Sequence, residues 1–252
     1  MHTNRILRAL LLLALLVGTG RTPVGAEEPA EGRPNILFVL TDDHATRAVG
    51  AYGSGLNRTP QIDRLAAEGV VFERAYCGNS ICAPSRASFL TGLHSHAHGT
   101  RTNLDHVDAS QPTFVSSLRA AGYATALIGK WHLKCEPQGF DHWQMLPSQG
   151  SYYNPDVVTE EGTSRHRGYV TDITTDLALA WLRSREGEDA PFLLLCHHKA
   201  PHRTWSPGPD HLTDFDDRSM PEPASLFDDY ANRNRQLPKN EMTIAGHLMD
   251  DY

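Results

Sequence analysis

Residues 80–92 read Ser-Ile-Cys-Ala-Pro-Ser-Arg-Ala-Ser-Phe-Leu-Thr-Gly and predict a short helix that begins near a cysteine. Proline is tolerated in a first helical turn, and a glycine such as Gly92 commonly follows the last turn. Cys82 is therefore expected at or just before the helix N-terminus, where the macrodipole and free N–H groups favour negative charge. Arg86 follows four residues later on the same helix face. A nucleophile beside an arginine at a positive helix end suits attack on an anionic group.

Three short apolar runs predict the strands of a parallel sheet. The run 35–40 has the length and β-branched content of a fully buried strand, and the runs 123–128 and 192–196 predict two more core strands. Helical signals alternate with these runs, which favours an α/β, doubly wound, mostly parallel sheet with helices on both faces. Helices are expected over 59–69, 113–121 and 170–183, with a brief strand over 70–72, a long surface excursion over 135–168 and the start of a helix over 240–252.

Polar and charged residues follow each of the three predicted strands. Because the carboxyl ends of parallel strands share one edge of the sheet, these side chains are expected at one ligand-binding edge. Two adjacent aspartates offer the hard oxygen ligands that Ca²⁺ or Mg²⁺ prefers, although such pairs are more often solvated loop or capping residues. A lysine and a histidine at a strand end can likewise be solvated residues of a turn. The residues in question are Asp42 and Asp43, then Lys130 and His132, then the polar run 197–202.

The cysteine stretch, C-x-P-S-R followed by x-x-Phe-Leu-Thr-Gly, resembles the signature of the formylglycine-dependent sulfatase family, which belongs to the alkaline-phosphatase-like superfamily. Residues 122–132 are similar to the second signature of that family, in the family's order. The resemblance implies that Cys82 is oxidised to formylglycine (3-oxoalanine) by a formylglycine-generating or an anaerobic sulfatase-maturating enzyme. It also implies that Asp42 and Asp43, alongside residue 82, bind one divalent cation, usually Ca²⁺.

The resemblance further implies a role for each basic residue in sulfate-ester hydrolysis. Arg86, Lys130 and Lys199 would neutralise oxyanion charge, and Lys130 would also hold the formylglycine oxygens. His202 would protonate the departing alcohol, and His132 would deprotonate the formylglycine hydrate to release sulfate. An unmodified thiol lacks the second hydroxyl that this release requires, so the cysteine is expected to be a precursor of the nucleophile.

The stretches 139–143 and 149–155 look like those of sulfatases that act on 6-O-sulfated N-acetylglucosamine, as in glycosaminoglycan degradation. The alternatives are another carbohydrate sulfatase, or a phosphodiester or phosphonate hydrolase of the same superfamily. Members of the family are roughly twice this long and supply a second metal-binding pair and a late lysine from later sequence. The chain therefore resembles the N-terminal part only, with the C-terminal portion missing, and an inactive truncated remnant is a further alternative.

The N-terminus predicts export of the protein. Residues 1–26 have the charged, apolar and small-residue regions of a signal peptide, residues 27–33 resemble a linker, and 34–252 are assigned to an incomplete catalytic domain. A periplasmic or secreted location is expected, without a stable membrane anchor, because the apolar run 9–17 is short for a membrane span. A retained N-terminal anchor is the alternative.

The net charge of the chain bears on its ligands, and its four cysteines bear on disulfide formation. A net charge of -7 offers no basic face for nucleic acid, so a sulfated carbohydrate would need positive charge gathered locally. Cys196 is expected to be a buried thiol, and a disulfide between Cys77 and Cys135 is possible.

Overall fold

The computed structural model describes residues 32–239 and 243–249. The chain divides into two units, Met1–Pro34 and Asn35–Tyr252. In the first unit only residues 32–34 are described, and they form neither helix nor strand. The predicted signal peptide and most of the predicted linker therefore lie outside the described residues.

The second unit is built on one six-stranded sheet with the strand order β1-β6-β2-β3-β4-β5. Neighbouring strands are parallel from β1 through β6 and β2 to β3, and antiparallel from β3 through β4 to β5. The prediction of a mostly parallel sheet is confirmed. The strands are β1 (Ile36–Leu40), β2 (Ala124–Lys130), β3 (His142–Leu146), β4 (Asp156–Thr159), β5 (Gly162–Arg165) and β6 (Phe192–His197).

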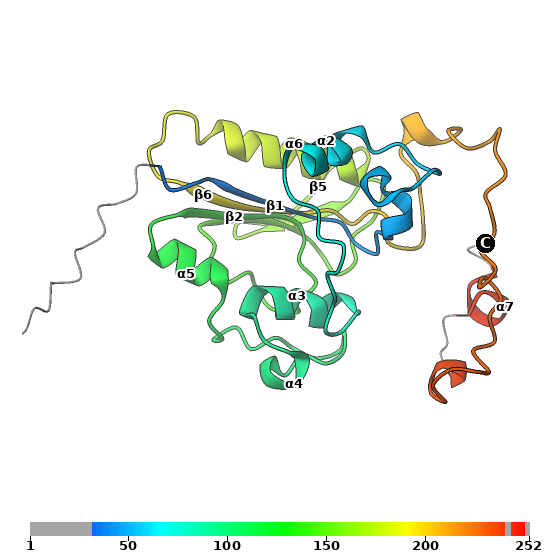
Figure 1. Ribbon diagram of the computed structural model, residues 1–252. Helices are drawn as coiled ribbons and strands as arrows, with labels where there is room; N and C mark the ends of the chain where they lie inside the picture. The colour runs from blue at the N-terminus through cyan, green and yellow to red at the C-terminus, as the bar shows by residue number, and fades with distance from the viewer. Residues whose placement is uncertain (1–31, 240–242, 250–252) are drawn as a thin grey trace, which may run out of the picture. The chain divides into compact units, whose positions relative to one another are not determined.

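Helices cover both faces of the sheet (Figure 1). Ala126 and Ile128 of β2 belong to a core cluster with Ala178 of α6 (Val170–Arg183). Leu127, which points to the opposite face, packs with residues of α3 (Cys82–Thr91) and α5 (Phe114–Ala120). This alternation follows from the two-residue period of a strand, and it confirms the doubly wound arrangement.

Several short elements complete the described structure. None of its helices is both long and apolar enough to cross a membrane, within the residues described. The remaining described helices are α2 (Pro60–Glu68), α4 (Ser95–His98) and α7 (Ile244–His247). The described 3-10 helices are Thr46–Ala48, Gly50–Tyr52, Pro209–His211 and Leu237–Lys239.

Local sequence signals account for the helix limits. In α3 the proline stands in the first turn, and Gly92 adopts φ 71° just after the last residue. In α5 the side chain of Thr113 accepts the N–H of Ser116, whose own side chain accepts the N–H of Thr113 in return. The helices predicted over 59–69, 113–121 and 170–183 are confirmed within about two residues at each end.

Three predictions about the secondary structure are wrong. The strand β1 is not fully buried, because β1 lies at the sheet edge and Leu37 and Val39 are 54% and 56% exposed. Residues 70–72 form no strand and are exposed. The region 135–168 is not only a surface excursion, since it contributes β3, β4 and β5 to the sheet.

The remaining predictions concern the C-terminus and the cysteines. Of the helix expected over 240–252, the described residues 243–249 contain only the turn Ile244–His247. All four cysteines are free, so Cys77 and Cys135 form no disulfide in this structure, and Cys196 is buried as expected.

Candidate active site

The predicted site residues gather where β1, β2 and β6 end. Asp42 lies two residues beyond β1, Lys130 is the last residue of β2, and Lys199 lies two residues beyond β6. Two backbone hydrogen bonds join the carboxyl ends of β1 and β6. The N–H of Asp42 donates to the carbonyl of Ala200 (3.1 Å), and the N–H of His198 donates to the carbonyl of Leu40 (2.8 Å). The first turn of α3 presents Cys82 to the same edge.

Asp42 is the centre of a buried charge network. One carboxylate oxygen accepts a hydrogen bond from Arg86 Nη2 at 3.0 Å and also pairs with Lys130 Nζ. Asp42, Arg86 and Lys130 are 6%, 4% and 0% exposed. Burial acts to raise the pKa of Asp42, but the hydrogen bond and charge of Lys130, with the charge of Arg86, outweigh burial, and the pKa lies below its ordinary value. The carboxylate is therefore ionised and holds both cations.

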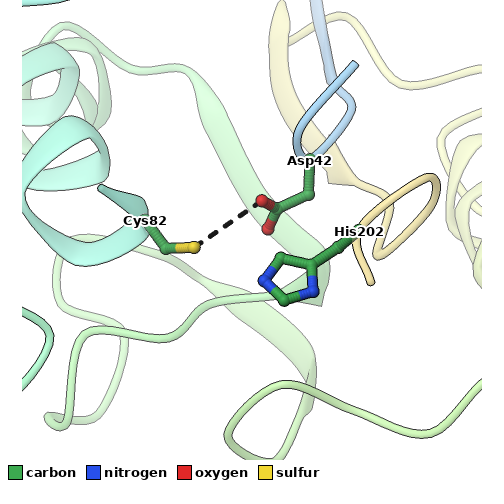
Figure 2. A group of neighbouring side chains, drawn as sticks. All are labelled: Asp42, Cys82 and His202. Atoms are coloured by element: carbon green, nitrogen blue, oxygen red, sulfur yellow. Dashed lines mark hydrogen bonds between the residues drawn. The ribbon is translucent and has the colours of Figure 1, made fainter. Parts of the chain in front are cut away.

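The thiol of Cys82 points into this network (Figure 2). Its sulfur lies 3.7 Å from the second oxygen of Asp42 and 4.0 Å from Lys130 Nζ. Helix N-termini and nearby cations usually lower the pKa of a thiol. Here burial, followed by the negative charges of Asp42 and Asp43, raises the pKa of Cys82 against the opposing effect of Lys130. The cysteine is accordingly a protonated thiol and a poor nucleophile as it stands.

His202 lies beside Asp42 and Cys82, and these three residues form one cluster. Its Nε2 lies 3.7 Å from an oxygen of Asp43, whose side chain is 60% exposed. Its Nδ1 contacts the carbonyl of Arg203, and because a carbonyl only accepts, Nδ1 carries the hydrogen. Nε2 is therefore the nitrogen presented to Asp43 and to the cluster of Asp42 and Cys82 (Figure 2).

His132 and Lys199 complete the predicted set without touching Cys82 directly among the contacts described. Burial, followed by the charges of Lys130 and Arg86, lowers the pKa of His132 to about 4, so the imidazole is neutral at pH 7. Its buried Nδ1 has no hydrogen-bond partner among the described residues. Lys199 is 5% exposed, and burial, followed by the charge of Lys130, lowers its pKa.

Sequence analysis missed the roles of two residues in this network. Gln149 Oε1 accepts a hydrogen bond from Lys130 Nζ at 2.5 Å. His197, which is fully buried, places Nδ1 3.2 Å from Arg86 Nη1, and burial holds the pKa of His197 well below its ordinary value. Gln149 lies in the stretch 149–155 that resembles those of certain sulfatases, and His197 directly follows the predicted strand 192–196, but neither signal predicts these contacts.

The aromatic residues of the stretches 139–143 and 149–155 lie mainly in the core. Phe140 and Trp143 are each 6% exposed and pack in the cluster beneath α3 and α5. Tyr152 is 8% exposed. Burial leaves these three rings without the open face that stacking on a sugar requires, so in this structure they stabilise the fold.

A cleft of about 620 Å³ opens over the cluster and is large enough for a sugar sulfate. Among the residues that the structure describes, Asp42, Cys82 and His202 form the group of potential ligands for a metal ion. Asp42 and Asp43, which both line the cleft, supply the carboxylate oxygens that a hard cation such as Ca²⁺ prefers. The donor set thus fits a hard divalent cation in kind and would supply part of its coordination shell.

Comparison with known proteins shows the family to which the chain belongs. The family model named Sulfatase matches residues 34–239. The chain is 44% identical over 255 aligned residues to an N-acetylglucosamine-6-O-sulfatase of Bacteroides thetaiotaomicron, covering 100% of the chain and 45% of that relative. It is 31% identical over 230 residues to an N-acetylgalactosamine-6-sulfatase of Rattus norvegicus, covering 76% of the chain and 43% of that relative.

Solved structures agree with this family assignment. One, a complex of a protein with its substrate D-glucosamine-2-N,6-O-disulfate, matches with a TM-score of 0.84 and 46% identity over 88% of the chain and 45% of its own length. Another, in complex with a neocarrahexaose, matches with a TM-score of 0.71 and 24% identity over 75% of the chain and 50% of its own length, which shows the shared fold. The chain thus spans about half the length of the relatives it matches. The chain belongs to the sulfatase family.

Proposed function

We propose that the protein containing this chain hydrolyses sulfate esters of a sulfated carbohydrate, with 6-O-sulfated N-acetylglucosamine as its substrate. The observation that carries the proposal is the position of Cys82, at the first turn of α3 and beside the buried network of Asp42, Arg86 and Lys130. The similarity to an N-acetylglucosamine-6-O-sulfatase and to a structure that binds a glucosamine disulfate supports this choice of substrate.

The charge of the site suits a sulfate group. Three cationic side chains gather here, Arg86, Lys130 and Lys199, against the two carboxylates of Asp42 and Asp43. The local excess of positive charge arises in a chain whose net charge is -7. Buried cations that are already in place stabilise negative charge on the sulfate oxygens without further reorganisation.

Maturation of Cys82 to formylglycine is part of the proposal. The raised pKa of the Cys82 thiol supports this step, because a protonated thiol is a poor nucleophile. A formylglycine-generating or anaerobic sulfatase-maturating enzyme would be the partner, and the modified residue would supply the nucleophilic hydroxyl. Asp42, Asp43 and residue 82 would hold one Ca²⁺, which would polarise the sulfate oxygens.

The basic side chains of the site bind the sulfate and transfer the protons. Lys130 and Lys199 bind the sulfate oxygens, and Arg86 keeps Asp42 ionised and in place. His202 presents Nε2 to the cluster, and its imidazolium form, which carries a hydrogen on Nε2 as well as on Nδ1, delivers the Nε2 proton to the departing alcohol. His132 is neutral at pH 7, so it can accept the proton that must leave before sulfate is released.

The first test is turnover by the full-length protein produced with a maturating enzyme. Cys82→Ala should lower kcat for N-acetylglucosamine 6-sulfate by at least about 10⁴-fold, since the nucleophile is lost, with folding retained. Cys135→Ala is the matched control, because this free thiol lies outside both the cleft and the Asp42 cluster, and it should keep wild-type activity.

Two outcomes would contradict the proposal. Unchanged turnover in Cys82→Ala would exclude residue 82 as the source of the nucleophile. Faster hydrolysis of an aryl phosphate than of an aryl sulfate would favour the phosphohydrolase alternative over the sulfatase.

We also propose that the protein is exported to the periplasm or secreted, on the basis of residues 1–26. Cell fractionation followed by N-terminal sequencing tests this proposal. Cleavage after Ala26 is expected, whereas an intact N-terminus in the cytoplasm would contradict export.

A further inference from the structure

Tyr152 contacts both residues that follow β6 in the site. Its hydroxyl donates a hydrogen bond to the backbone carbonyl of His202 at 2.5 Å. The ammonium of Lys199 lies 4.6 Å from the centre of its ring. One side chain thus contacts the loop at two points, three residues apart, and each point carries a residue with a proposed role in hydrolysis.

The ring of Tyr152 is itself held firmly. It is 8% exposed and stacks on Tyr169, with the centroids 6.0 Å apart and the planes 16° from parallel. The backbone carbonyl of Tyr152 accepts the N–H of Val170 at 2.7 Å, at the start of α6. Leu146 and Val157 complete the apolar cluster around it. The tyrosine is therefore a rigid support rather than a mobile surface residue.

Lys199 needs such a support. Its side chain is 5% exposed, and within the described residues it forms no ion pair closer than 4.0 Å, so burial is uncompensated by a carboxylate contact. The face of an aromatic ring attracts a cation, and more strongly where water is excluded. The ring therefore offsets part of the desolvation of Lys199 and fixes where the ammonium sits.

The hydroxyl of Tyr152 acts on His202 in a different way. The hydrogen bond fixes the backbone from which the imidazole extends, while the N–H of His202 donates to the carbonyl of Lys199 at 3.1 Å and closes the turn. Burial raises the pKa of Tyr152 to about 12, so the hydroxyl keeps its hydrogen and stays a donor over the physiological range.

We propose that Tyr152 is a positioning residue with two separable actions: its ring holds Lys199 against the sulfate, and its hydroxyl holds His202 against the leaving oxygen. The inference rests on the proposed sulfatase function and adds a residue to that site. It predicts that ring and hydroxyl can be removed one at a time with different consequences.

The test compares Tyr152→Phe and Tyr152→Leu in the full-length matured protein. Removing the hydroxyl alone should lower kcat for N-acetylglucosamine 6-sulfate by about 3–10-fold and leave the affinity for inorganic sulfate unchanged. Removing the ring as well should also weaken inorganic sulfate binding, measured by calorimetry, by about 3–30-fold.

The neighbouring tyrosine provides a matched control. Tyr153 also donates its hydroxyl to a backbone carbonyl, that of Pro207 at 2.6 Å, and also packs on Tyr169, but its described contacts include neither Lys199 nor His202. Tyr153→Phe and Tyr153→Leu should therefore keep both the wild-type kcat and the wild-type sulfate affinity. Thermal unfolding of all four variants separates these effects from a general loss of stability.

The outcomes are distinguishable. A loss of kcat confined to the Tyr152 pair, with sulfate affinity restored in the Phe variant, supports the inference. Equal effects at Tyr152 and Tyr153, or losses that follow thermal stability alone, overturn it. A wild-type protein that binds sulfate but hydrolyses no sulfate ester would refute the proposed function, and the sulfate titrations would still decide whether the ring positions Lys199.

Discussion

Asp42 and Asp43 are adjacent in the sequence and occupy opposite environments. Asp42 is 6% exposed and pairs with Arg86 and Lys130, whereas the Asp43 side chain is 60% exposed. Asp42→Asn leaves two buried cations without their carboxylate, and breaking a buried ion pair by removing one partner costs about 3–5 kcal/mol of unfolding free energy. Asp43→Asn should cost about 1 kcal/mol or less, because exposed pairs contribute little.

Thermal unfolding of the two full-length variants in excess EDTA measures this difference without a contribution from a bound cation. The Asn substitution keeps the size of each side chain, so the comparison isolates the charge. A melting temperature for Asp42→Asn equal to that of Asp43→Asn would show that Asp42 is not the residue that compensates the buried cations.

Sequence spacing predicts contacts within one element and fails for contacts between elements. The four-residue spacing of Cys82 and Arg86 is a helical repeat, and both side chains reach the same buried carboxylate. The bond between Lys130 and Gln149 joins positions 19 residues apart, and the contact between Arg86 and His197 joins positions 111 apart. These partners depend on how the elements pack, so the sequence indicated the chemistry of the site but not its supporting residues.

Among the elements, helices with strong local signals were predictable, and the strands β4 and β5 were not. The helix α6 has the predicted bounds of Val170 and Arg183, since its apolar period is long and regular. The strands β4 and β5 have four residues each, and every residue of β5 is exposed. A strand of this kind has no buried face and therefore no apolar alternation to reveal it.

Gly129 shows how closely β2 and β6 must approach to build the site. It pairs with His197 across the two strands and adopts φ +103°. A Cβ at this position would lie 2.0 Å from the backbone oxygen of His197, so Gly129→Ala must move β6 or distort β2. We expect a loss of about 3 kcal/mol or more in unfolding free energy, from backbone strain of about 1–3 kcal/mol and overpacking of about 1–3 kcal/mol.

Gly162 is the matched control for this substitution. It is the first residue of β5 and adopts φ +135°, and a Cβ there would meet no atom within 4 Å. Gly162→Ala should therefore cost only the backbone strain of about 1–3 kcal/mol. Denaturant unfolding of both variants checks the prediction, and a smaller loss at Gly129 than at Gly162 would contradict the close approach of the strands.

For the molecule as a whole, the sequence predicted the sheet and the edge that carries the site but not how β1 is covered. Three apolar runs ending in polar residues were sufficient to place the site, because parallel strands share their carboxyl ends. The burial of a strand depends on what packs against it. The prediction that the run 35–40 is fully buried therefore assumed a neighbour that the described residues do not supply.

The unpaired edge of β1 should promote self-association when the segment 35–252 is produced alone. Within the described structure β1 pairs only with β6, so one edge offers free backbone groups beside Leu37 and Val39, which are 54% and 56% exposed. An apolar strand with an unpaired edge is a site for association between copies.

We expect the segment 35–252, produced alone, to self-associate in light scattering and to bind a hydrophobic dye. The double substitution Leu37→Thr with Val39→Thr should reduce both the self-association and the dye binding. Leu104→Thr is the control, because Leu104 is 79% exposed in a turn outside the strands and should change neither. A monomeric segment that binds no dye would show that the outer face and edge of β1 do not drive association.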